Sequence, residues 1–224
     1  MTADEIIAQL SLQANAQVVE GMVKFGIRPT HALGISIPAL RKIAREIGKS
    51  HALALELWVS GIHEARILAS MIAEPHLVSS QQMEAWVNEF DSWDVCDQVC
   101  GNLFDRTPHA YQKAIEWCHR EQEFVRRAGF VMMAELAVHD RSAPDEAFLP
   151  FFPLMKQYAV DKRNFIKKAV NWALRQIGKR NSRLRVIALE WAEAIKDMDS
   201  TTAQWIAKDA IKELHTKSKL EAKV

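Results

Sequence analysis

Apolar residues recur with the period of an α-helix along almost the whole chain. Between residues 165 and 177 the apolar positions fall on one side of a helical wheel, at Ile166, Ala169, Val170, Ala173, Leu174 and Ile177. Alternation with a period of two, which would indicate β-strands, is scarce, and the short run from Gly34 to Ile37 stops at Pro38. The pattern therefore predicts an all-α protein.

Short segments with a shared pattern recur along these predicted helices: a basic residue beside a small one, followed by apolar positions. They lie at residues 64–69, 125–130 and 166–171, with a looser copy at 206–211. The step between repeats is about 30 to 40 residues, measured on five register marks, which are Arg66, Asp97, Arg127, Lys168 and Lys208. We therefore expect a curved solenoid of HEAT- or armadillo-like helix pairs, an α-α superhelix whose concave surface suits a long ligand.

Length and composition agree with one folded domain. The chain has 224 residues, 49% hydrophobic and 25% charged, which excludes a disordered or fibrous protein. Turn signals such as Arg28-Pro29-Thr30 separate the helical stretches, and residues 199–202 predict the start of a last helix. Because no composition break divides the chain, we expect a single domain over residues 1–224, with a flexible charged tail from about Lys217.

The expected compartment is the cytoplasm. Three cysteines are an odd number and do not suggest a set of disulfides, so a reducing environment fits better. The first ten residues lack the basic start and apolar run of a signal peptide. No stretch of about 18 uncharged apolar residues is present, so we expect no membrane span.

Basic residues are concentrated late in the chain. Residues 156–190 hold ten Lys and Arg and two acids, a net +8 in a chain of net +1, so the other residues carry −7. Such asymmetry indicates a surface that faces a polyanion, although a solvated helix face is the plainer explanation.

One helical face sharpens the interpretation of this charge. At about 100° per residue, Lys168, Trp172, Arg175 and Lys179 share a face away from the apolar stripe. An aromatic ring among cations is the combination that nucleic-acid contact requires, cations for phosphates and a flat apolar face for a sugar or base. The alternative is that Trp172 packs on a neighbouring helix.

The sequence from Asp91 to Asp97 reads as the start of another helix, with Asp91 or Ser92 as its N-cap. Asp94 lies in the first turn, where the helix dipole favours a carboxylate, and we interpret it as structural. Asp97 lies one turn further on and shares a face with Trp93. Its carboxylate either forms a salt bridge with Arg126 or Arg127 of the next repeat, or it is catalytic beside an aromatic wall.

Metal and nucleotide motifs are lacking. Cys96 and Cys100 are one helical turn apart and could join Cys118 and His119 around zinc, but no C-x-x-C pair occurs, and we interpret the cysteines as small core residues. The sequence has neither a glycine-rich phosphate loop, nor a His-Glu-x-x-His pair, nor a Gly-x-Ser-x-Gly elbow. We therefore expect no metal and no cofactor.

Together these segments resemble the DNA alkylation-repair glycosylases built from HEAT-like repeats, the AlkD-like family. The resemblance covers residues 20 to 212 or so and depends on the order and spacing of four stretches. They are Gly34-Ile35-Ser36-Ile37-Pro38-Ala39-Leu40-Arg41, Ser92-Trp93-Asp94-Val95-Cys96-Asp97, Phe124-Val125-Arg126-Arg127-Ala128, and residues 164–175, NFIKKAVNWALR.

The resemblance implies roles for particular residues. Asp97 takes the position of the family's catalytic aspartate. Trp93 and Trp172 take the positions of two tryptophans that contact the backbone of the lesion nucleotide. Arg127 takes the position of the arginine that contacts phosphate, with Arg126 as the adjacent alternative.

The resemblance also implies a reaction and a partner. The family removes cationic N3- and N7-alkylated purines from duplex DNA without a metal or cofactor, and without extruding the damaged base. We therefore expect a monomeric, bacterial-type cytoplasmic enzyme, associated with the nucleoid when it acts and not with a membrane. The residues expected to contact DNA are Arg126, Lys167, Lys168, Arg175, Lys179 and Arg180.

Two other functions remain open on the sequence. A non-catalytic HEAT-repeat protein could bind DNA in the same groove, in which case Asp97 would contribute nothing to any reaction. A helical solenoid could also be a scaffold for protein interactions, and it would then have no affinity for DNA.

Overall fold

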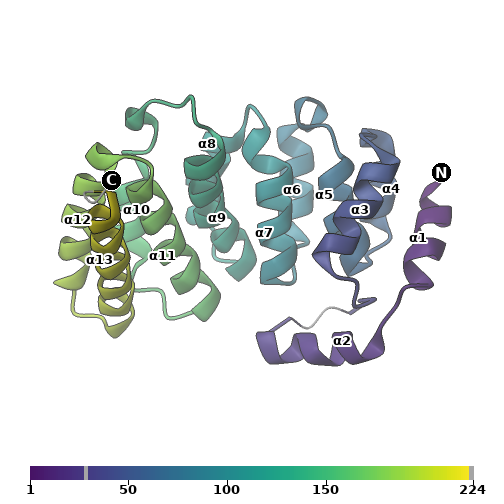
Figure 1. Cartoon of the computed structure of the whole chain (residues 1–224), viewed down its shortest axis with the longest axis horizontal. Coiled ribbons are helices and arrows are strands. Elements are labelled where there is room, and N and C mark those ends of the chain that lie inside the picture. Colours follow the sequence, from purple (N-terminus) through teal and green to yellow (C-terminus); the bar gives the residue numbers. More distant parts are fainter. Residues whose placement is uncertain (28–29, 222–224) are drawn as a thin grey trace. The chain divides into compact units, whose positions relative to one another are not determined.

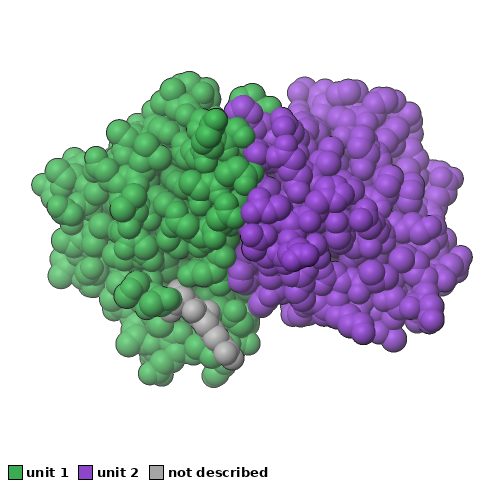
Figure 2. All heavy atoms as spheres, turned by 180° about the vertical axis from the view of Figure 1, so that it is seen from behind, with its two compact units in different colours: residues 1–108 green, residues 109–224 purple. Residues whose placement is uncertain are grey.

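The computed structural model describes residues 1–27 and 30–221, and every regular element in those residues is a helix (Figure 1). The predicted all-α class is therefore confirmed. Contacts group the chain into two compact units, Met1–Pro108 and His109–Val224, which Figure 2 distinguishes by colour. The expectation that residues 1–224 form a single domain stays a prediction.

The first unit contains seven α-helices and three short 3-10 helices. In chain order these are α1 (Ala3–Ser11), α2 (Ala16–Met22), η1 (Val23–Phe25), α3 (Ile37–Ile47), α4 (His51–Val59), α5 (His63–Ile72), η2 (Pro75–Leu77), α6 (Ser80–Asn88), α7 (Trp93–Asn102) and η3 (Phe104–Arg106). Helix α5 packs against α3, α4 and α7, so it is the central element of this unit.

The second unit contains longer helices. They are α8 (Ala110–Cys118), α9 (Glu123–His139), η4 (Asp145–Ala147), α10 (Phe151–Tyr158), α11 (Asn164–Lys179), α12 (Ser182–Lys196) and α13 (Thr201–Glu221). Helix α11 packs against both α9 and α13. The predicted start of the last helix is confirmed at Thr201, and Ser200 Oγ accepts a hydrogen bond from the Ala203 amide. Helix α13 continues to Glu221, and residues 222–224, the end of the tail expected to be flexible, lie outside the described residues.

Hydrogen bonds between successive repeats show the predicted spacing. In the first unit, residues joined across repeats are 29 to 32 positions apart, as in His63–Asp94 and Ser70–Asn102. In the second unit, the pairs that join α9 to α11 or to the turn before it, and α11 to α13, are 34 to 38 positions apart. In both units the numbers of the two partners rise together, so these helices run parallel.

The cores are aromatic in both units. In the first, the Trp58 and Trp86 rings stack with centroids 4.0 Å apart, and Phe90 and Phe104 pack around them. In the second, aromatic rings meet at the α8–α10 packing, where Tyr111 stacks on Phe151. Rings of this size bury much apolar area per residue, which short helices need for stability.

A buried carboxylate fixes the loop that precedes α3. Glu64, only 1% exposed, accepts hydrogen bonds from the backbone amides of Leu33, Gly34 and Ile35, at 2.6 to 3.3 Å. Gly34 has a φ of +76°, and an added Cβ would lie 2.4 Å from the Asn15 carbonyl oxygen. Only glycine fits both the positive φ and this close approach. The hydrogen bonds to Glu64 therefore hold the loop, and Gly34 allows its backbone conformation.

Candidate nucleic-acid interface

Helix α7 carries the two predicted site residues of the first unit. Of the two N-cap candidates in the sequence, Asp91 and Ser92, the structure has Ser92, and the helix begins at Trp93. Trp93 and Asp97 lie one turn apart, and both side chains are half-buried. The indole Nε1–H of Trp93 donates to the Phe25 carbonyl oxygen at 3.0 Å, so the last turn of the α2–η1 segment is tied to this helix.

The other aspartate of α7 has a different environment. Asp94 Oδ2 lies 2.8 Å from Nε2 of His63, the buried first residue of α5. Burial alone would raise the pKa of the Asp94 carboxyl, but the hydrogen bond and charge of His63 outweigh it, and the pKa is lowered. Burial likewise opposes the charged form of His63, yet Asp94 raises the pKa of the imidazole above its ordinary 6.5. Asp94 thus joins two repeats, in agreement with its interpretation as structural.

The two adjacent arginines of α9, Arg126 and Arg127, both form contacts with other residues of the second unit. Arg127 is only 5% exposed and donates from Nη1 to the Phe165 carbonyl oxygen at 2.5 Å. Arg126 donates to Asp161 at 2.9 Å and to the Cys118 carbonyl at 3.0 Å, and its guanidinium lies 4.6 Å from the centre of the Tyr158 ring. The phosphate contact predicted for one of them stays a prediction, and each arginine already joins two repeats.

Asp161 shows how strongly these cations act on an acid. Burial would raise the pKa of its carboxyl, but hydrogen bonds from Arg163 and Arg126 lower the pKa to about 2. Arg163 also donates to the Glu121 carbonyl oxygen. The acid is therefore ionised throughout the physiological range and organises two arginines of the basic segment.

The predicted basic face of α11 is present but partly neutralised. Lys168 is exposed and Trp172 is half-buried on that face. Arg175 and Lys179, however, both donate to the carboxylate of Glu213 on α13, with Lys179 Nζ 2.6 Å from Oε1. Burial tends to raise the pKa of Glu213, and the two cations lower it.

Two further residues that are predicted to contact DNA also have partners within the protein. Arg180 donates to the carbonyl oxygens of Ala137 and Ala143, at 3.1 and 2.8 Å. The Lys167 ammonium lies 4.5 Å from the centre of the Trp205 ring. Contact of these side chains with DNA stays a prediction, and for Arg180 it would compete with two backbone contacts.

The structure brings one pair of the predicted site residues together, since Trp93 and Asp97 lie one turn apart on α7 in the first unit. Arg127 and Trp172 lie on α9 and α11, two helices of the second unit that pack against each other, and Arg127 contacts Phe165, two turns before Trp172. The meeting of all four around one substrate stays a prediction.

Sequence analysis missed Glu213 and Trp205, which contact the predicted cations. Glu213 follows Arg175, and Trp205 follows Lys167, by one repeat step of about 38 residues, so the repeat spacing in the sequence points to both partners.

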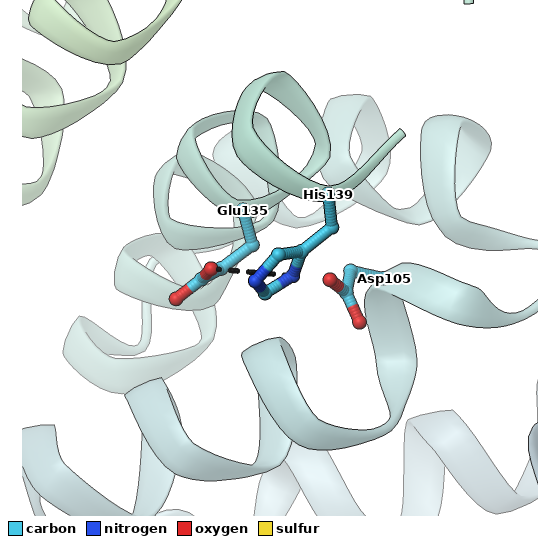
Figure 3. A group of neighbouring side chains, drawn as sticks. All are labelled: Asp105, Glu135 and His139. Carbon is cyan, nitrogen blue, oxygen red and sulfur yellow. Dashed lines mark ion pairs between the residues drawn. The ribbon is translucent and has the colours of Figure 1, made fainter. Parts of the chain in front are cut away.

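The three cysteines lie in the interior. Cys96, Cys100 and Cys118 are thiols outside any disulfide and are fully buried, and burial raises the pKa of the Cys118 thiol. Glu135 and His139 lie one turn apart near the end of α9, with His139 Nδ1 3.6 Å from Glu135 Oε2 (Figure 3).

The described helices and their repeat spacing define a class, the HEAT-like repeat proteins. The chain superposes with a TM-score of 0.78 on a solved structure from a new family of proteins related to the HEAT-like repeat DNA glycosylases, with affinity for branched DNA structures. The superposition covers 93% of this chain and 94% of the other at 19% identity, which establishes the fold. A designed armadillo repeat protein overlaps more loosely, with a TM-score of 0.38, and the assignment does not depend on it.

The sequence comparison gives the family. Residues 6–214 match the model of the DNA alkylation repair enzymes, so the chain belongs to that family. The uncharacterised protein Lin0241 of Listeria innocua is 25% identical over 154 residues, which are 66% of this chain and 67% of the relative. The resemblance and the solenoid class are therefore confirmed. No described helix has the length and apolar character needed to cross a bilayer.

Proposed function

We propose that this protein is a DNA glycosylase that excises cationic N3- and N7-alkylated purines from duplex DNA. Its family and its HEAT-like fold support the proposal at the level of DNA repair. The observation that carries the finer proposal is on α7, where the half-buried Asp97 carboxylate lies one turn from the Trp93 ring. Asp97 has the position that the resemblance assigns to the family's catalytic aspartate, whereas Asp94, the other aspartate of that helix, joins α7 to His63 of α5.

A carboxylate and an aromatic wall suit this reaction. An alkylated purine is already positively charged and leaves without much acid assistance, so charge develops on the deoxyribose as an oxocarbenium-like cation. A fixed carboxylate stabilises that cation and can orient the attacking water. At about 4 Å and an effective dielectric constant near 20, one such pair contributes up to roughly 4 kcal/mol, or about three decades of rate.

Phosphate contacts would position the duplex without reading its sequence. The exposed Lys168 beside Trp172 is the best placed of the predicted contacts on α11. For Arg127 to reach a phosphate, its guanidinium, which is only 5% exposed and donates to the Phe165 carbonyl oxygen, would have to become more accessible. We place this activity in the cytoplasm, on the chromosome.

The deciding experiment measures release of N3-methyladenine and N7-methylguanine from alkylated duplex DNA under single-turnover conditions. Asp97→Asn should slow release about a thousandfold, because the carboxylate acts on the transition state. Asp94→Asn on the same helix is the matched control and should change the rate by no more than a few fold at temperatures where it stays folded. Absence of release above background by folded wild-type protein would refute the enzyme proposal.

A second candidate is a non-catalytic protein that binds DNA of unusual shape. The observation that favours it is the TM-score of 0.78 with the member of a family that has affinity for branched DNA. It predicts salt-sensitive DNA binding that Lys168→Ala weakens, while Asp97→Asn leaves affinity unchanged or tightens it by removing a negative charge. The same release assay separates the two functions.

A further inference from the structure

One tryptophan has an environment unlike the others. Of the seven tryptophans, all within the described part of the chain, Trp205 alone is exposed, with 43% of its surface accessible. It lies near the start of α13, whose buried face is formed by Ala203, Ile206, Ala207, Ala210 and Leu214. A ring this large is seldom left in water unless it is used for binding.

The ring of Trp205 is held in place by a neighbouring helix. The Lys167 ammonium of α11 lies 4.5 Å from the ring centre, within the range of a cation–π interaction. Close by, the Asn171 side chain donates to the Ile206 carbonyl oxygen at 3.1 Å, which fixes α11 against α13 beside the ring. Trp205 is therefore an exposed ring on a rigid support.

The surroundings of the ring are cationic. Lys208 and Lys212 follow Trp205 at i+3 and i+7, on the same side of α13, and both are exposed. Lys168, beside Lys167 on α11, is exposed as well. Asp209 follows Trp205 at i+4 and lies 3.7 Å from Arg175, which also pairs with Glu213.

We propose that Trp205 and Lys167 form a stacking platform for an unpaired nucleobase of DNA, with the surrounding lysines contacting the flanking phosphates. A flat ring among cations matches the two faces of a nucleotide, the apolar base and the anionic phosphate. Bases inside a duplex are stacked on one another and offer no free face, so the platform selects DNA with a single-stranded tail, flap or loop. This inference depends on the proposed DNA binding but not on base excision.

The test compares three unmodified DNAs of equal charge by fluorescence anisotropy: a blunt duplex, a duplex with a single-stranded tail, and a four-way junction with every base paired. Trp205→Ala should lower affinity for the tailed duplex about tenfold, since stacking on an aromatic side chain contributes 5- to 150-fold per base. Affinity for the duplex and the junction should change less than twofold. Trp205→Phe should restore most of the loss.

Lys167→Met should lower affinity for the tailed duplex by a few fold, because the ring loses its support and one cation. Lys196→Met on α12 is the matched control, since that lysine pairs with Glu193 on its own helix. Equal loss on all three DNAs, or no loss on the tailed duplex, would overturn the proposal, and the latter would indicate that the ring serves a protein contact. Base release from alkylated duplex should be the same in Trp205→Ala and wild type, so failure of the glycosylase proposal is detected separately.

Discussion

The two units differ in the side chains that join their successive repeats. In the first unit, the acids Glu64 and Asp94 accept hydrogen bonds, from backbone amides and from His63. In the second, cations donate them, with Arg126 bound to Asp161, Arg127 to a carbonyl, and Arg175 and Lys179 to Glu213. The repeat step differs too, at 29 to 32 residues against 34 to 38.

This difference changes how the positive charge of residues 156–190 is interpreted. At least six of its ten cations contact an acid, a carbonyl oxygen or an indole ring within the second unit, namely Arg163, Lys167, Arg175, Lys179, Arg180 and Arg183. A count of charges along the sequence therefore overstates the charge available to DNA. Much of the surplus has a structural role, and the exposed lysines are the clearest candidates for phosphate contact.

The largest expected effect is on the first unit. Glu64→Ala removes the acceptor for three backbone amides and should lower the free energy of unfolding by about 3 kcal/mol, because buried donors lose their partners. Urea denaturation measures the change. Glu64→Gln should lose less, because it keeps one oxygen. Glu56→Ala, an exposed acid on α4, should be nearly neutral, and equal losses for Glu64→Ala and Glu56→Ala would contradict the assigned role.

A smaller, pH-dependent effect is expected at the joint between α5 and α7. The folded pKa of His63 lies above 6.5, so its contribution is fully present below that pH and is lost as the pH rises through the folded value. The folded pKa of Asp94 lies below 3.8, so its contribution is present above 3.8 and is lost as the pH falls through the folded value. The pair therefore stabilises most between about pH 4 and 6.5.

Asp94→Asn should accordingly lower the free energy of unfolding by about 1.5 kcal/mol near pH 5.5, and by clearly less near pH 9. Urea titrations at the two pH values provide the measurement. A loss of the same size at both would show that the imidazole charge plays no part in the joint.

The smallest effect tests the second unit directly. Glu213→Gln should release Arg175 and Lys179 from their shared acid, raise duplex affinity about threefold to tenfold, and steepen the plot of log K against log salt by about 1 to 2. Glu193→Gln removes the same charge from an exposed pair with Lys196 on α12 and should change both quantities less. Identical behaviour of the two variants would mean that net charge alone matters.

Helix class, repeat spacing and the start of the last helix could be predicted from the sequence, because apolar periodicity and turn residues are local signals. The sequence predicted that Lys168 and Trp172 lie on one face of α11, because the relative position of two residues one turn apart depends only on helical geometry. The engagement of Arg175 and Lys179 is not visible in their own helix, because their partner Glu213 is 34 to 38 residues away, and only the repeat step points to it. For the same reason the first-turn position of Asp94 indicates a structural role at the helix dipole but not its contact with His63, 31 residues earlier.

The hydrogen bond from the Trp93 indole to the Phe25 carbonyl has a consequence for any ligand at α7. No residue of α2 is fully buried, and Phe25 itself is 70% exposed, so the hydrogen bond from Trp93 is a direct link between this turn and α7. An indole has a single proton to donate, and it cannot serve the Phe25 carbonyl and an incoming oxygen atom together. A ligand that captures that proton would therefore detach the turn, at a cost of about 1 kcal/mol. Ligand binding at Trp93 and release of the last turn of the α2–η1 segment would therefore be coupled in one equilibrium.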